Sequence, residues 1–143
     1  MSTAGPPAGA ACSYLRHRVA YYETDAMGIV HHSNYIRYLE LGRVRFLAER
    51  HRPYTEYVAA GLHFAVTRVE CDYRRSACFD EELSICTWLE WVRGASLRMA
   101  YTIAGPRGLL VCAATEHAMA SDTGRVRRIP PAWREELARL AAG

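Results

Sequence analysis

Residues 24–35 read Thr24-Asp25-Ala26-Met27-Gly28-Ile29-Val30-His31-His32-Ser33-Asn34-Tyr35, and the rest of the chain is organised around them. The residues before them, Tyr14 to Tyr22, are β-prone and mixed in polarity, and they stop at Glu23. This pattern predicts a first strand that runs into a loop. The acidic residue, the glycine and the paired histidines all lie in that loop.

A long helix is predicted directly after the loop. Asn34 is a favourable N-cap residue, and apolar residues then recur with helical spacing at Tyr35, Leu39, Gly42 and Phe46, flanked by Ile36 and Leu47. The helix should end near Arg50, because Pro53 disfavours helical geometry in the residue before it. Gly42 lies on the apolar side, where it would let a sheet approach closely.

Beyond a second short helix near residues 54–60, closed by Gly61, the apolar period changes from about four to two. Four long strands are predicted, marked in turn by Val69 to Tyr73, Leu83 to Trp91, Leu97 to Ile103, and Leu109 to Met119. Pro130-Pro131 opens an amphipathic C-terminal helix. The predicted fold class is α+β, with an antiparallel sheet wrapped around the long helix. Its exposed edge and outer face favour dimerisation.

The 143 residues, half of them hydrophobic, suit one domain over residues 14–143 behind a disordered leader at residues 1–13. The net charge of +3 is too small to indicate nucleic-acid binding. No segment predicts a signal peptide or a membrane span. Five scattered cysteines without a CxxC pair suit reduced thiols, so we expect a cytoplasmic protein with no membrane partner.

Acyl transfer needs a nucleophile or a base, and a donor for the developing oxyanion. Asp25 supplies the carboxylate, and it lies in the loop that leads to the positive end of the helix, where backbone N–H groups are unpaired. Gly28 allows the positive φ that would turn such amides into a pocket. Asp25 could attack an acyl carbonyl or act as general base on water. An ordinary Asx-turn is the alternative for this residue.

The same twelve residues resemble the signature of the 4-hydroxybenzoyl-CoA thioesterase and YbgC-type acyl-CoA thioesterase family. The resemblance covers about Tyr14 to Ser121, and it implies the hotdog fold, a homodimer or homotetramer, and hydrolysis of acyl-CoA or acyl-carrier-protein thioesters without a cofactor. It implies Asp25 as the catalytic carboxylate. His32 stands where the YbgC-type branch carries a histidine, and its backbone N–H is a candidate oxyanion donor.

Further residues are candidates for substrate binding. His31, where the family usually has an aromatic residue, and Tyr21, four residues before Asp25, are candidates for the acyl pocket. Phe79 could complete that pocket across a subunit interface, as the resemblance implies. Arg74 and Arg75 are candidates for the phosphates of coenzyme A. The histidines are adjacent and lack zinc-type spacing, so no metal is expected.

Several alternatives stay open from the sequence. The protein could be a carrier-protein thioesterase of a polyketide-type pathway, although Asp25 counts against the enediyne-type subgroup, which usually lacks the carboxylate. It could also be a non-catalytic module that binds acyl ligands on the same fold. Glu40 on the helix is the reserve catalytic residue, since a distinct hotdog branch places its catalytic Glu there. The acyl group is not specified.

Overall fold

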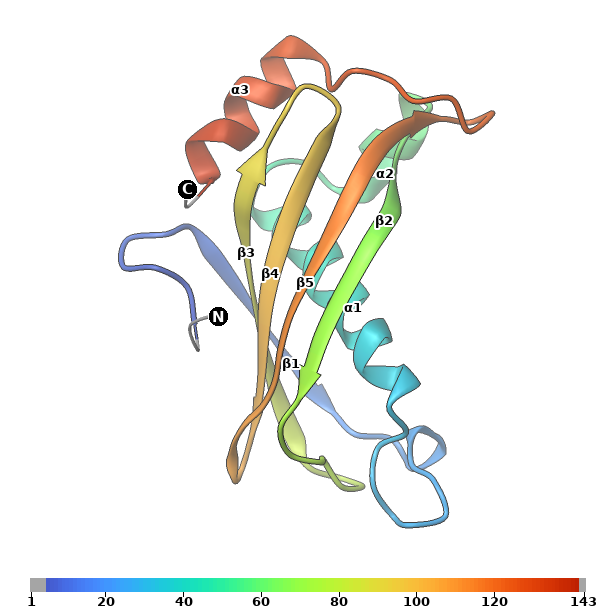
Figure 1. Cartoon of the computed structure of the whole chain (residues 1–143), viewed down its shortest axis with the longest axis vertical. Coiled ribbons are helices and arrows are strands. Elements are labelled where there is room, and N and C mark those ends of the chain that lie inside the picture. The colour runs from blue at the N-terminus through green and yellow to red at the C-terminus, as the bar shows by residue number, and fades with distance from the viewer. Residues whose placement is uncertain (1–4, 142–143) are drawn as a thin grey trace.

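The computed structural model describes residues 5–141, which form one sheet, one long helix and smaller helices around them (Figure 1). The elements in chain order are β1 (Cys12–Arg18), the 3-10 turn η1 (Tyr21–Glu23), α1 (Ser33–Arg50), α2 (Tyr54–Ala59), β2 (Leu62–Tyr73), β3 (Glu82–Val92), β4 (Ser96–Gly105), β5 (Gly108–Ser121) and α3 (Pro131–Leu140). The five strands form an antiparallel sheet in the order β1-β3-β4-β5-β2, with α1 on one face. The predicted α+β class and hotdog architecture are confirmed.

Helix α1 buries the apolar stripe that the sequence predicts. Tyr35, Leu39, Gly42, Phe46 and Leu47 are all buried, and they face the sheet. Burying each large apolar side chain of this kind contributes roughly 1.5–3 kcal/mol, so the helix is held by packing more than by its own propensity. The helix ends at Arg50, as Pro53 predicts.

The inner face of the sheet is built by one parity of residues on each strand. Thr87 of β3 pairs with Tyr101 of β4, which pairs with Ala113 of β5, which pairs with Cys71 of β2. Leu83, Ile85 and Leu89 of this parity are fully buried, but a β-bulge after Leu89 pairs Trp91 with Arg98 and takes it off this face, so that Val92 follows on the inner side. The alternation predicted for the second long strand is therefore confirmed as far as Leu89.

Gly42 is the point of closest approach between helix and sheet. A Cβ atom built on Gly42 would lie 2.5 Å from Thr87 Oγ1 and 2.8 Å from Ile85 Cγ2. Both distances are far inside van der Waals contact, so the helix could not lie this close to β3 with any larger residue. The predicted role of Gly42 is confirmed.

Three local features differ from the sequence-based expectation. Strand β1 ends at Arg18 rather than Tyr22, because Val19 N–H and Val19 C=O bond to the 80–81 segment and the chain then turns into η1. It starts at Cys12, two residues inside the expected leader, whose residues 1–4 lie outside the described part of the chain. Asn34 is not the N-cap of α1.

Asn34 instead lies in the first turn of the helix and is buried. Its side-chain amide donates a hydrogen bond to the Glu23 carbonyl at 2.8 Å. The residue that precedes α1 is His32. The Asn34 side chain therefore does not cap the helix but links its first turn to Glu23, which precedes the loop.

Strand β2 borders the sheet, and within residues 5–141 it pairs with β5 alone. Three of its side chains on the inner parity are largely exposed, namely Val66, Val69 and Tyr73. A twelve-residue edge strand with exposed apolar side chains is a typical template for pairing with another chain.

At the other end of the chain, α3 begins at Pro131 and buries Leu137, as predicted. None of the helices described here is long and apolar enough for a bilayer crossing.

We expect Gly42→Ala to lower the free energy of unfolding by about 1–3 kcal/mol, because overpacking against Thr87 and Ile85 outweighs the gain in helix propensity of at most about 1 kcal/mol. Urea unfolding followed by circular dichroism measures the change. Ala48→Gly, on the exposed side of the same helix, is the control that isolates the propensity contribution. A Gly42→Ala protein more stable than the native chain would contradict the close contact.

Candidate active site

Residues 24–30 form a tight hairpin that carries Asp25. Thr24 and Val30 form an antiparallel bridge, and Asp25 N–H donates to the Ile29 carbonyl at 2.8 Å. Gly28 N–H returns to the Asp25 carbonyl at 2.9 Å, and Gly28 has φ of 79°. This is the left-handed region that glycine adopts without strain, as predicted for this position.

One carboxylate oxygen of Asp25 is used by the loop itself. Oδ1 accepts a hydrogen bond from Met27 N–H at 2.8 Å, the geometry of an Asx-turn. Among residues 5–141 no donor is bound to Oδ2. The Asx-turn and a catalytic role are therefore compatible, since one oxygen orients the carboxylate and the other stays accessible.

The hairpin is fixed against the segment that follows β2. Val30 N–H donates to the Ala77 carbonyl at 2.8 Å, and Ile29 bridges to Cys78. Ala77 N–H in turn donates to the phenol oxygen of Tyr35 on α1, at 3.0 Å. Loop, helix and the 77–78 segment thus hold one another in place.

The first turn of α1 presents backbone N–H groups beside this loop. Ser33 N–H donates to Nδ1 of His31 at 3.2 Å, so the His31 ring accepts at the helix start and Ser33 Oγ–H donates to the same nitrogen at 2.8 Å. Among the residues from 5 to 141 no acceptor is bound to the His32 N–H. This amide is free for a ligand at the positive end of the helix.

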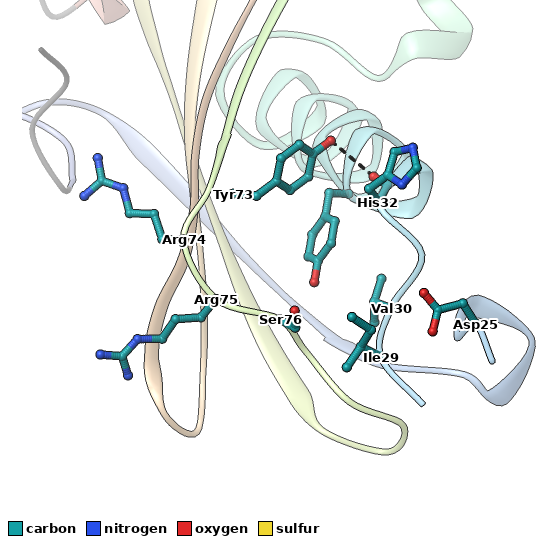
Figure 2. Close-up of a pocket in the computed structure, with 9 residues that line it drawn as sticks. Asp25, Ile29, Val30, His32, Tyr73, Arg74, Arg75 and Ser76 are labelled. Carbon is teal, nitrogen blue, oxygen red and sulfur yellow. Dashed lines mark hydrogen bonds between the residues drawn. The ribbon is translucent and has the colours of Figure 1, made fainter. Parts of the chain in front are cut away.

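A cleft of about 250 Å³ opens between the loop and the end of β2 (Figure 2). It is lined by Asp25, Ile29, Val30, His32, Tyr35, Tyr73, Arg74, Arg75 and Ser76. The structure therefore brings together the two predicted catalytic residues and the two predicted arginines. In Figure 2 the side chains of Arg74 and Arg75 extend away from Asp25. Both arginines therefore line the edge of the cleft and point away from the Asp25 carboxylate.

Four other predicted residues do not line this cleft. Tyr21 and Phe79 are 75% and 52% exposed, and their rings form an edge contact with centroids 5.5 Å apart. Gly28 lies in the turn of the hairpin, and the exposed His31 side chain accepts at the helix start. Their assignment to substrate binding stays a prediction.

Two tyrosines line the cleft without having been singled out by sequence. Tyr73 O–H donates to the His32 carbonyl at 3.3 Å, drawn as the dashed line in Figure 2. Burial, followed by the contact with Cys71, raises the pKa of Tyr73 to about 12, and burial raises the pKa of Tyr35. Both phenols are neutral near pH 7. The alternation in β2 places Tyr73 on the same face as Val69 and Cys71. Its contact with His32 is a tertiary contact, which the alternation does not predict.

Glu23 is a further residue near the site that sequence reasoning missed. It precedes the hairpin, is buried, and its carboxylate accepts hydrogen bonds from His17, Ala20 N–H and Tyr38. Burial favours the neutral form, but these hydrogen bonds outweigh it and hold the pKa of Glu23 below its ordinary value. The sequence signal was weak, since a glutamate between Tyr22 and Thr24 suggests no buried partner.

No group of three or more His, Cys, Asp or Glu side chains within the described chain is arranged to hold a metal ion. The chemistry available in the cleft is that of a carboxylate, backbone amides, phenols and guanidinium groups. This set suits acyl transfer.

Comparison with known proteins agrees with this geometry. The model of the thioesterase-like superfamily matches residues 19–139. The acyl-CoA thioester hydrolase YbgC of Escherichia coli is 31% identical over 66% of this chain and 70% of its own length. The crystal structure of the hypothetical protein TT1821 from Thermus thermophilus is 34% identical, with a TM-score of 0.87 over 93% of this chain and all of that one.

A DHNA-CoA thioesterase from Staphylococcus aureus is also similar in structure, at 25% identity and a TM-score of 0.86 over 90% of each chain. The chain belongs to the thioesterase-like superfamily, as the resemblance of residues 24–35 implied. It is a thioester hydrolase with the hotdog fold.

Proposed function

We propose that this protein hydrolyses acyl-CoA thioesters with Asp25 as the catalytic carboxylate. The observation that carries the proposal is that Asp25 and His32, whose backbone N–H is free, line one cleft at the start of α1. A thioester carbonyl between them would meet a carboxylate oxygen on one side and a hydrogen-bond donor on the other. The names of relatives such as YbgC support coenzyme A as the thiol.

Two routes lead to the same products. In the first, a carboxylate oxygen of Asp25 bonds to the acyl carbon, the C–S bond breaks, the thiolate leaves, and water then hydrolyses the mixed anhydride. In the second, Asp25 takes a proton from a water molecule as that water attacks the acyl carbon, and the proton ends on the departing sulfur. The free Oδ2 fits either role.

The His32 N–H is proposed to stabilise the developing oxyanion. It lies at the N-terminus of an eighteen-residue helix, where the helix dipole favours negative charge. A single donor of this kind typically contributes about 10²–10³ in kcat. The Tyr73 hydroxyl donates to the carbonyl of the same residue, which lies in the next peptide unit, and so adds a contact that holds the backbone at residue 32. The imidazole of His32 could also orient water.

We expect Asp25→Asn to lower thiol release from acyl-CoA esters by about a hundredfold or more, equivalent to roughly 2.7 kcal/mol of transition-state stabilisation. An asparagine Oδ1 can still accept from Met27 N–H, so the Asx-turn and the loop should survive. A panel of acyl-CoA esters assayed with a thiol reagent measures the loss. Asp72→Asn, an exposed carboxylate on β2, is the matched control. Equal turnover by Asp25→Asn and the native chain would refute the assignment and make Glu40 the next residue to test.

Arg74 and Arg75 are proposed to contact the phosphates of coenzyme A. Both border the cleft from the chain that leaves β2, and both are exposed. Arg75 also donates to the Arg107 carbonyl at 2.6 Å, and the Arg107 guanidinium donates to the Ser76 carbonyl at 2.8 Å while pairing with Glu81 at 3.0 Å. Paired guanidinium groups suit phosphate recognition.

The double variant Arg74→Ala, Arg75→Ala should raise KM for acyl-CoA by about tenfold, as expected for the loss of roughly 1.4 kcal/mol of phosphate binding, and leave kcat nearly unchanged. The same acyl group on N-acetylcysteamine, which lacks phosphates, should show no change in KM. Arg134→Ala on α3 serves as the charge control. An equal change for both thioesters would remove these arginines from coenzyme A recognition.

The enzyme is further proposed to act as a homodimer in which β2 pairs with β2 of a second copy. The exposed Val66 and Val69 and the free edge of β2 support this arrangement. Because Tyr73 at the end of the same strand lines the cleft, such pairing places the cleft beside the subunit boundary. Phe79 of one subunit is then a candidate for the acyl pocket of the other.

Val69→Lys should shift the native dimer toward monomer in analytical ultracentrifugation, since a charge would be placed at the paired edge. Val58→Lys makes the same change at a similarly exposed valine on α2 and should leave the dimer intact. A native chain that sediments as a monomer would rule the dimer out.

Two other functions predict different results in these assays. A thioesterase specific for acyl-carrier protein would turn over that substrate and not acyl-CoA, and its affinity for free coenzyme A would be weak at every salt concentration. A non-catalytic acyl-binding module would release no thiol from any ester. The carboxylate in the cleft favours an enzyme, because a neutral acyl chain offers it no partner.

A further inference from the structure

Glu23 is the one acidic residue among the buried side chains of residues 5–141, with 7% of its surface exposed. Its Oε1 accepts from Ala20 N–H at 2.8 Å, from the Tyr38 hydroxyl at 2.9 Å and from His17 Nε2 at 3.0 Å. The donors come from β1, from the turn after it and from α1. A single carboxylate thus joins three parts of the chain.

The main chain of Glu23 makes a second set of contacts at the base of the catalytic hairpin. Its carbonyl accepts from His31 N–H at 2.9 Å and from the Asn34 side-chain amide at 2.8 Å. His31 follows the hairpin and Asn34 lies in the first turn of α1. Both ends of the hairpin and the start of the helix therefore meet at one residue, two positions before Asp25.

A buried carboxylate costs several kcal/mol unless hydrogen bonds replace its hydration. For Glu23 these are supplied by His17, Ala20 and Tyr38, and the Tyr38 ring packs against the His17 ring with centroids 4.7 Å apart. Removing the carboxylate would leave the Tyr38 hydroxyl and the Ala20 N–H without their acceptor. The backbone at residue 23 would then lose its side-chain ties to β1 and α1.

We propose that Glu23 is a positioning residue that fixes the hairpin and the first turn of α1 relative to each other. It acts through Asp25 and the His32 amide, which must lie on opposite sides of the reacting carbonyl, and it touches no substrate. This inference rests on the proposed function. A displacement of about 1 Å in such a site can cost a hundredfold in rate, so its effect falls on kcat.

The first test is local hydrogen exchange, which needs no turnover. In Glu23→Ala the hydrogen-bonded amides of Asp25, Gly28, Val30 and His31 should exchange about tenfold faster or more, while amides of β3 and β4 keep their native rates. Glu23→Gln should show a smaller change, because its Oε1 can still accept from Ala20 and Tyr38. A smaller change in Glu23→Gln than in Glu23→Ala is expected only if the acceptor oxygen of residue 23 holds the hairpin in place.

Tyr38→Phe and Tyr57→Phe form a matched pair in case Glu23→Ala does not fold. Each removes a hydroxyl from a fully buried tyrosine, one bonded to Glu23 and the other to His51 at the far end of α1. Tyr38→Phe should speed the hydrogen exchange of the hairpin amides by about threefold, and Tyr57→Phe should leave their exchange rates unchanged. Equal exchange of the hairpin in both variants would overturn the proposal.

The second test is the kinetics of acyl-CoA hydrolysis, measured well below the unfolding midpoint of each variant. Glu23→Ala should lower kcat by about tenfold or more with KM within about twofold, and Glu23→Gln should recover part of the loss. If kcat follows the folded fraction alone, the positioning role is wrong. If the native chain hydrolyses no ester while the hairpin still loosens, the proposed function fails and the structural hold of Glu23 on the hairpin stands.

Discussion

The close approach of α1 to β3 at Gly42 is the contact on which the remaining geometry depends. Because no side chain separates the helix from Thr87 and Ile85, the stripe from Tyr35 to Leu47 reaches the inner face of the sheet along its whole length. This contact also fixes where the helix begins. The first turn of α1 lies beside the end of β2, where the Tyr73 hydroxyl donates to the His32 carbonyl.

The hairpin before the helix is held mainly by main-chain hydrogen bonds, with Val30 at its end packed into the hydrophobic core. Its tip, around Met27, is exposed, while its base rests on main-chain bonds to Glu23 and Ala77. Packing positions the helix and hydrogen bonds position the loop. Core packing and loop hydrogen bonds meet at Tyr35, which is buried in the core and whose phenol oxygen accepts from Ala77 N–H.

The sequence predicted what depends on periodicity and on local backbone preference. The stripe of α1, the alternation in β3 as far as Leu89, the stop before Pro53 and the close approach at Gly42 all follow from spacing, and the structure confirms them; the bulge that turns Trp91 to the other face does not follow from spacing. The sequence could not predict which residues far apart along the chain would contact each other. Asn34 has the composition of an N-cap, yet its amide bonds to Glu23, and the burial of Glu23 depends on Tyr38, fifteen residues away.

The two walls of the cleft differ in how freely their sequences can change. Residues 24–31 are tied by their own main chain at Glu23, Ile29 and Ala77, so most substitutions there must preserve a demanding backbone path. The opposite wall, residues 73–76, leaves the last strand of the sheet and projects mainly side chains. Divergence in substrate preference among such enzymes should therefore accumulate on this second wall, while the hairpin retains its pattern over long evolutionary times.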